Sequence, residues 1–464
     1  MKNINITNII VLLLGIGLFA YTFTRAITVP MTIDESSSFF NYVELRTNWQ
    51  IMFDMACFDT ANNHVLNTYC ARLGYSLFGM HELSVRWGSL LAHFIYLFYT
   101  WKLSKRLLAN QWLAVALFVI VNVNPYLLDF FSLERGYAWS MACVAASLYY
   151  FYEKNAWKSA LFIALGVLAN LTMLNYLASF FVVYNLALLL EKNTFQDFFK
   201  KNIPNLLCFS VLALLFFRPI KELKEHGEFL YGNDSLLEVF SSIWKNTCYS
   251  ADYLGWDGPT AIAVIYGFLF VTAPLLAFFQ YRKTNDTRRF LLVLFPLVAV
   301  IMMILQYHLA GSKYLINRTA LILFPLLLFS LLAWLDFTNK KIAAFWAIVI
   351  AGFALFHFKE TGNLKLAREW WFDAHNQEMV DYLEAKAQSE NKRYTINVSR
   401  VFIPSVNFCV RKNLNTRLSI PMFEPQLPTD TTFDYLFIFD NEAQKINPAY
   451  QLEKKFGFFL LMKK

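Results

Sequence analysis

The stretch IIVLLLGIGLFAYTFTRAITVPMTIDE, Ile9 to Glu35, joins an apolar run of membrane-span length to two adjacent carboxylates. The run can also be a signal-peptide core, but no small-x-small cleavage site follows it, so we interpret it as a retained first span. A chain avoids charge at the mouth of a span unless the charge is paired, solvated or used. Position alone favours solvated interfacial carboxylates for Asp34 and Glu35.

The rest of the 464-residue chain has the composition of a polytopic membrane protein. Hydrophobic residues make up 57% and charged residues 16%, where soluble domains average about a quarter charged, and the mean hydropathy is +0.40. The net charge of +8 is also found in nucleic-acid binders. However, Lys and Arg lie mostly in short loops between apolar runs, which favours membrane orientation over nucleic-acid binding.

The apolar runs predict about eleven transmembrane helices, each near the roughly 20 residues that a span requires. They lie near 9–27, 83–101, 111–128, 137–152, 157–173, 176–190, 205–218, 260–280, 289–306, 315–335 and 342–358.

Basic residues gather in alternate loops, which predicts the orientation. One set holds Lys102, Lys105, Arg106, Lys154, Lys158, Lys192, Lys200, Lys201, Arg282, Lys283, Arg288, Arg289, Lys340 and Lys341. The short loops of the other set hold far fewer. Because Lys and Arg accumulate on the cytoplasmic side, we predict the N-terminus inside and the C-terminus outside.

Three longer stretches are then external: 28–82, 219–259 and the tail 359–464. The second ends in an expected interfacial turn, 249–259. The tail combines a polar helix-like stretch with strand-like runs such as FDYLFIFD, which predicts a small soluble α/β domain. The run Phe456 to Met462 is too short to span a membrane. We therefore predict a transmembrane domain over 1–358 and an extracytoplasmic α/β domain over 359–464.

The first external loop contains a helix-like stretch after His64. Val65, Leu66, Tyr69, Leu73 and Leu77 recur at helical spacing, which predicts a helix lying along the membrane interface. A carboxylate covered by such helices is half dry and can act as a base near neutral pH.

Four motifs in order resemble the GT-C superfamily of integral membrane glycosyltransferases. They are DE after the first span, NNHVLNTYCARLGYSLFG with ELSVRWGSLLAH, SLERGYAWSMACVAASLYYFY, and GSKYLINRTALILFPLLLFSLLAW. The chain is most similar to the branch with protein mannosyltransferase-like, RgtA/B/C/D-like and aminoarabinose transferase-like enzymes, over roughly 1–335. It departs from that branch where Val65 and Leu66 replace prolines often found after the histidine, and where Ser36 follows Glu35 without a nearby basic residue.

The resemblance implies an inverting glycosyltransferase with a polyprenyl-phosphate-linked sugar donor and a glycan, lipid or protein acceptor. It implies Asp34 as the base that takes the proton from the acceptor hydroxyl. Glu35 would position the acceptor or keep the pKa of Asp34 in range. The sugar is a hexose or a pentose, no cofactor is implied, and a divalent metal is not expected.

Donor contacts are expected from cations near the membrane surface, because a leaving phosphate needs its charge stabilised. We predict His64, Arg135, Arg318, Lys313, Tyr314 and Arg86 as donor phosphate or sugar contacts. Each Arg can instead extend its charge to lipid headgroups, and a lone histidine is often simply packed.

Two other function classes remain open from the sequence. A transporter or flippase of lipid-linked sugars would show internal repeats and polar residues at the midplane, whereas the polar residues here gather at one face. A non-catalytic envelope-assembly subunit would not depend on Asp34. We expect a bacterial inner-membrane location with the active site facing outward. Cys57 and Cys70 share the first loop and can pair if it faces an oxidising compartment.

Overall fold

The computed structural model describes residues 6–252, 258–331, 340–421 and 431–464, and it consists of two compact units. The helical unit comprises Met1–Phe23, Asn48–Tyr69 and Gly88–Asn363, and the mixed unit comprises Thr24–Thr47, Cys70–Trp87 and Leu364–Lys464. The mixed unit thus combines the tail with two stretches from the N-terminal part of the chain. No single boundary along the chain describes this division, since each unit combines three separate stretches. The domain boundary at 358 stays a prediction.

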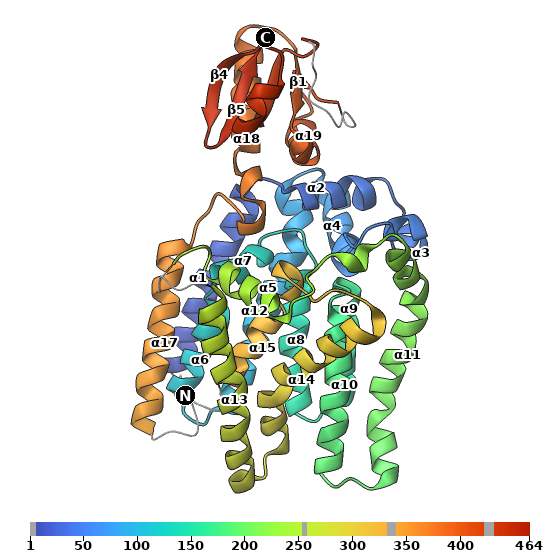
Figure 1. The fold of residues 1–464 in the computed structure, drawn as a ribbon, viewed down its shortest axis with the longest axis vertical. Coiled ribbons are helices and arrows are strands. Elements are labelled where there is room, and N and C mark those ends of the chain that lie inside the picture. Colours follow the sequence, from blue (N-terminus) through green and yellow to red (C-terminus); the bar gives the residue numbers. More distant parts are fainter. Residues whose placement is uncertain (1–5, 253–257, 332–339, 422–430) are drawn as a thin grey trace. The chain divides into compact units, whose positions relative to one another are not determined.

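Long helices make up most of the chain (Figure 1). Their bounds are α1 Ile6–Thr28, α5 Glu82–Leu107, α6 Gln111–Asn122, α7 Pro125–Phe131, α8 Tyr137–Tyr152, α9 Ala156–Ala169, α10 Met173–Leu190, α11 Phe195–Glu225, α12 Leu236–Thr247, α13 Gly258–Thr284, α14 Thr287–Ala310, α15 Leu323–Ser330 and α17 Lys340–Thr361.

Every predicted span overlaps one of these helices, and the polytopic α-helical membrane fold is confirmed. Among the described residues, α1, α10, α11, α14 and α17 are long and apolar enough to cross a membrane, which makes five spans by that criterion. A sixth is possible if α6 and α7, bent by 70° at their junction, form one broken span. The other predicted spans are shorter or less apolar helices. The predicted turn 249–259 and the end of the span 315–335 fall partly outside the described residues.

The bend between α6 and α7 follows from its sequence. The side chain of Asn124 accepts hydrogen bonds from the backbone N–H groups of Tyr126 (3.1 Å) and Leu127 (3.3 Å), and therefore caps a new helix. Pro125 occupies the first turn of α7, where its missing N–H costs nothing. Cap and proline together begin a helix in a new direction.

The basic loops of the helical unit meet at one end of the bundle, where Figure 1 shows the turns between α10 and α11 and between α13 and α14. Glu191, which ends α10, pairs with Arg288 of α14 (2.9 Å) and with Lys154 (3.1 Å). Arg106 pairs with Glu153 (2.7 Å). These contacts involve four loops that the charge pattern assigns to one side: α5–α6, α8–α9, α10–α11 and α13–α14.

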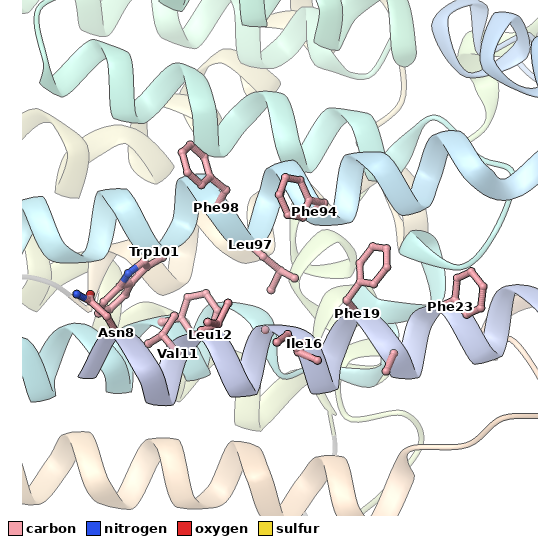
Figure 2. A pocket seen from close by; sticks show the side chains of 13 residues that line it. Asn8, Val11, Leu12, Ile16, Phe19, Phe23, Phe94, Leu97, Phe98 and Trp101 are labelled. Atoms are coloured by element: carbon pink, nitrogen blue, oxygen red, sulfur yellow. The ribbon is translucent and has the colours of Figure 1, made fainter. Parts of the chain in front are cut away.

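An apolar groove of about 910 Å³ lies along α1 and α5. Figure 2 shows its lining side chains, including Ile16 and Phe19 of α1 and Phe94 and Phe98 of α5. Ile16 is 57% exposed and Phe94 61% exposed. Large exposed apolar surfaces of this kind belong to proteins covered by lipid or by a partner.

The tail forms a sheet of five strands in the order β2-β1-β3-β5-β4, which confirms the predicted α/β domain. The strands are β1 Tyr394–Val398, β2 Leu418–Ser419, β3 Tyr435–Phe439, β4 Gln451–Phe456 and β5 Phe459–Lys463. β1 runs parallel to β3, and β3 pairs antiparallel with β5, with Phe437 opposite Leu461. Helices α18 (Asn376–Ser389) and α19 (Ile403–Arg411) pack on the sheet through a shared core that contains Leu383, Val406 and Phe437.

Within the mixed unit, α19 also packs against two short N-terminal helices, α2 (Ile33–Ser38) and η1 (Phe39–Glu44). The rings of Phe39 and Phe408 meet edge-on with centroids 5.2 Å apart. Arg411 binds Glu44 through two hydrogen bonds of 2.7 and 3.2 Å. The helix after the first span is therefore held by the C-terminal tail. All six cysteines lie in described ranges, and no disulfide joins Cys57 to Cys70.

Candidate functional site

The sequence TIDE folds as the first turn of α2 because it forms a capping box. The Thr32 hydroxyl accepts the Glu35 N–H (3.3 Å), and the Glu35 carboxylate accepts the Thr32 N–H (2.9 Å). Asp34 therefore lies in the first turn of a helix, where the exposed N–H groups favour negative charge.

Glu35 is fully buried against Arg86, which is also fully buried. Nε and Nη2 of Arg86 each donate to Glu35 at 2.7 Å, and its other three N–H groups bond the carbonyls of Ala26 (3.1 Å), Val29 (2.7 Å) and Pro30 (3.0 Å). All five donors of the guanidinium are used. The geometry leaves Arg86 no donor for a phosphate, and it does not support Glu35 as a group that meets substrate. The pair instead fixes the junction between α1 and α2.

Asp34 is half-buried and has a neighbour that the sequence did not suggest, Asp373 of η5 (Arg368–His375). The Asp373 carboxyl accepts the N–H of Ile33 (2.8 Å), the Asn376 side-chain amide (2.7 Å) and the Ser405 hydroxyl (2.7 Å). Burial raises its pKa to about 8, and the charge of Asp34 adds to the rise while the three hydrogen bonds oppose it. Asp373 lies in the polar tail, 340 positions from Ile33, and no motif marks it.

A second polar site, the cationic pocket, lies in the helical unit as a cavity of about 490 Å³. Its charged lining residues are Arg135, Lys224, Lys313, Arg318 and Glu228, and its other polar lining residues are Asn62, His64, Tyr137, Asn170, Thr172, Tyr231, Gln306, Ser312 and Thr319. Four cations thus face one carboxylate among the described lining residues. The cavity has the charge of an anion-binding site.

The cations of this pocket are held in different ways. Arg135 is 2% exposed, and its Nη2 donates to Asn62 at 3.0 Å. The Arg318 guanidinium lies 5.5 Å from the centre of the Tyr231 ring. Lys313 pairs with the exposed Asp234. Arg135, with its side chain buried and fixed, is therefore the most preorganised of the three.

The predicted donor contacts stay a prediction, and the structure shows where each of these residues lies. The structure brings His64, Arg135, Lys313 and Arg318 together in the cationic pocket. Tyr314 is not among the lining residues; its ring stacks on Tyr307 at 4.5 Å. Helix α4 (Val65–Phe78) follows His64 as expected, with Leu77 65% exposed on its apolar stripe.

His64 is buried directly before α4, and its surroundings disfavour the protonated imidazole. Its pKa lies well below the ordinary value, first because of burial and then because of the positive charges of Arg135 and Arg318, although a hydrogen bond to the Ala169 carbonyl opposes the shift. The imidazole is neutral at neutral pH. With Nδ1 directed at that carbonyl, Nε2 is left as a hydrogen-bond acceptor.

Gly136 allows the start of α8 to lie close to both the Ala169 carbonyl and the His64 ring. A Cβ at Gly136 would lie 1.8 Å from the Ala169 carbonyl oxygen and 2.8 Å from Nδ1 of His64. Any side chain there would collide with backbone, so the start of α8 can meet the turn between α9 and α10 only through glycine.

Asn170 and Thr172, in that turn, are lining residues that the sequence did not identify. The short linker NLTMLNY between two apolar runs contains both. Two polar residues in so short a connection between apolar runs are the sequence signal for this part of the pocket.

One group of metal-ligating side chains occurs among the described residues: Asp59, Glu222 and His226, whose ligand atoms lie within 4.8 Å of one another. Asp59 and His226 are exposed, and His226 is within 3.4 Å of Glu222. Exposed acidic groups of this kind are common without an ion. That the reaction needs no divalent metal stays a prediction.

Comparison with known proteins supports the resemblance found in the sequence. Residues 65–220 match the model of the dolichyl-phosphate-mannose-protein mannosyltransferase family. ArnT from Cupriavidus metallidurans bound to undecaprenyl phosphate has a similar fold, with a TM-score of 0.55 at 10% identity over 98% of this chain and 97% of that chain. The apo state of ArnT matches with a TM-score of 0.53 at 9% identity over 97% of each chain. No curated protein matches the chain.

Proposed function

We propose that this chain, as a member of the GT-C superfamily, is an inverting glycosyltransferase that moves a hexose or pentose from a polyprenyl-phosphate donor to an acceptor hydroxyl. The family match and the shared fold support a membrane glycosyltransferase. The sidedness, the bacterial inner-membrane location and the class of acceptor belong to the proposal. The sidedness rests on the loop charges described above, and the class of acceptor rests on the resemblance to GT-C enzymes.

The cationic pocket carries this proposal. A buried Arg135 and a half-buried Arg318 flank a neutral histidine in a cavity large enough for a phosphosugar. Donors fixed before the reaction stabilise charge on a leaving phosphate without reorganisation. The related ArnT structure holds undecaprenyl phosphate, which is the kind of leaving group that such a pocket suits.

Asp34 is the proposed base. The acceptor oxygen attacks the anomeric carbon as the bond from that carbon to the phosphate oxygen breaks, and the electron pair leaves with the polyprenyl phosphate. The proton of the acceptor hydroxyl passes to Asp34, which the capping turn of α2 leaves half-exposed. A single displacement inverts the anomeric centre, and no metal is part of this step.

A transporter or flippase of lipid-linked sugars is the alternative. Such proteins place substrate groups near the membrane midplane, often on broken helices. The cationic pocket instead gathers helix ends, with lining residues from the end of α11, the end of α14 and the start of α10. An opening at the end of a bundle suits transfer at one surface.

Release of polyprenyl phosphate in membranes tests the proposal with Asp34→Asn. We expect a loss of about 10²- to 10⁴-fold, the usual contribution of a general base. The control is Asp381→Asn, an exposed carboxylate on α18, which should release lipid at the wild-type rate. Equal release by wild type and Asp34→Asn would refute Asp34 as the base. Substrate movement without release in the wild type would favour the transporter.

A further inference from the structure

We infer that His64, Asn170 and Thr172 form a subsite of the cationic pocket that recognises the hydroxyl groups of an uncharged sugar on the lipid-linked donor. The inference rests on the proposed function and deepens it. It specifies the class of sugar, which neither the fold nor the family match specifies.

Three polar atoms of the pocket have no hydrogen-bond partner within the described protein: Nε2 of His64, Nδ2 of Asn170 and Oγ1 of Thr172. His64 is 6% exposed and Asn170 4% exposed. Buried polar atoms in proteins almost always have partners. Three such atoms lining one cavity are what a polar ligand would satisfy.

The three side chains form one local cluster. His64 bonds the carbonyl of Ala169, the residue before Asn170. The Thr172 N–H donates to Oδ1 of Asn170 at 3.0 Å, which fixes the amide so that its Nδ2 is the atom without a partner. The histidine and the turn are therefore positioned by bonds that leave their remaining polar atoms for a ligand.

The chemistry of this cluster fits hydroxyl groups. Nε2 accepts a hydrogen bond, Nδ2 donates one, and a threonine hydroxyl does either. A sugar hydroxyl can meet all three, whereas an ammonium group can only donate. The nearby charges are Arg135 and Arg318, which repel an ammonium group.

The carboxylate of the pocket does not change this preference. Glu228 lies on η3 (Glu228–Leu230), and its carboxylate accepts the Ala61 N–H at 2.9 Å. No other described lining residue is acidic. The cluster of His64, Asn170 and Thr172 itself contains no carboxylate that could pair with the ammonium group of an amino sugar.

Binding of lipids to the full-length chain tests the inference by native mass spectrometry. The probes are undecaprenyl phosphate alone, undecaprenyl phosphate carrying a neutral hexose, and undecaprenyl phosphate carrying an amino sugar. Thr172→Val removes the hydroxyl and keeps the shape. Asn170→Ser removes the amide donor, adds no charge to the pocket, and keeps a side-chain oxygen that can accept the Thr172 N–H. Thr272→Val on α13 is the matched control, since its hydroxyl bonds the Phe268 carbonyl of its own helix (2.5 Å).

We expect the wild type and Thr272→Val to bind the neutral-sugar lipid at least tenfold more tightly than the amino-sugar lipid. Thr172→Val and Asn170→Ser should lose that preference and keep wild-type affinity for bare undecaprenyl phosphate. Arg318→Gln should weaken all three lipids alike.

Two results would overturn the inference while the proposed function stands: a wild-type preference for the amino sugar, or equal losses for bare and sugar-bearing lipid in Thr172→Val and Asn170→Ser. Failure of the wild type to bind bare undecaprenyl phosphate would instead refute the phosphate site itself, and the subsite with it.

Discussion

Asp373 connects the tail to the start of the first loop, beside Asp34. Its carboxyl holds the N–H of Ile33, the residue directly before Asp34. In a folded protein whose pKa for this group is about 8, the carboxyl is protonated over most of the physiological range. The neutral form of the Asp373 carboxyl therefore predominates beside Asp34 at neutral pH.

The stability of the protein should depend on pH through Asp373. A carboxyl whose pKa rises on folding binds more protons in the native state than in the unfolded state, so the free energy of unfolding falls as pH rises from about 4 to about 8. Asp373→Asn removes this term and keeps an acceptor for Ile33. We expect the melting temperature of the variant to match wild type near pH 5 and to exceed it near pH 8.5, measured by intrinsic fluorescence in detergent.

Asp381→Asn serves as the control for that series, because its exposed carboxylate should leave the pH curve unchanged. Parallel curves for wild type and Asp373→Asn would show that burial does not perturb Asp373.

For single residues, the sequence identifies candidate site residues that stand in or next to a motif. It does not identify those that lie outside any motif. Asp34, His64 and Arg318 are predicted because they follow a span or match a family pattern. Asp373 acts through contacts made only in the folded chain, and no motif marks it. For Asn170 the sequence does hold a signal, the polar residues of its short linker, but no motif stands there. Arg86 stood in a motif, yet its geometry is that of a structural residue.

The junction of α1 and α2 is the element most dependent on one side chain. Arg86 holds three carbonyls at the end of α1 together with Glu35 in α2. Removing one member of a buried ion pair leaves the other charge buried without a partner. This lowers the free energy of unfolding by about 3–5 kcal/mol. The end of the first helix therefore depends on a residue of α5.

Arg86→Gln should lower the free energy of unfolding by about 3–5 kcal/mol, and replacing both partners with Arg86→Met and Glu35→Leu should restore part of that loss. Arg106→Gln provides the matched control, since the Arg106–Glu153 pair is exposed (60% and 33%) and should cost at most about 1 kcal/mol. Titration with SDS measures the three variants. Similar losses for Arg86→Gln and Arg106→Gln would contradict the assigned role.

For the whole molecule, the role of the tail is the clearest addition from the structure. The sequence predicts the α/β domain because strand runs such as those of β1 and β3 alternate with a polar helix. It does not predict that α19 packs on α2, because that contact joins Phe408 to Phe39 across most of the chain. Patterns of local periodicity contain no information about such pairings.

Phe408→Ala should therefore impair transfer beyond its effect on stability. Phe408 and Phe437 are both fully buried, so either change to Ala costs about 3–5 kcal/mol. Only Phe408 packs with Phe39, on the segment that follows Asp34. At a temperature where both variants are folded, we expect kcat to fall at least tenfold in Phe408→Ala and to stay near wild type in Phe437→Ala. Equal kcat values for the two variants would argue against a positioning role for the tail.

The contact at Gly136 has a consequence for the evolution of the chain. Since a methyl group there meets the Ala169 carbonyl at 1.8 Å, a mutation to any other amino acid displaces the histidine bonded to that carbonyl. Positions 64 and 136 are therefore expected to change together or not at all. In a descendant protein that loses this glycine, a side chain from another part of the fold would have to replace the His64 imidazole in the cavity.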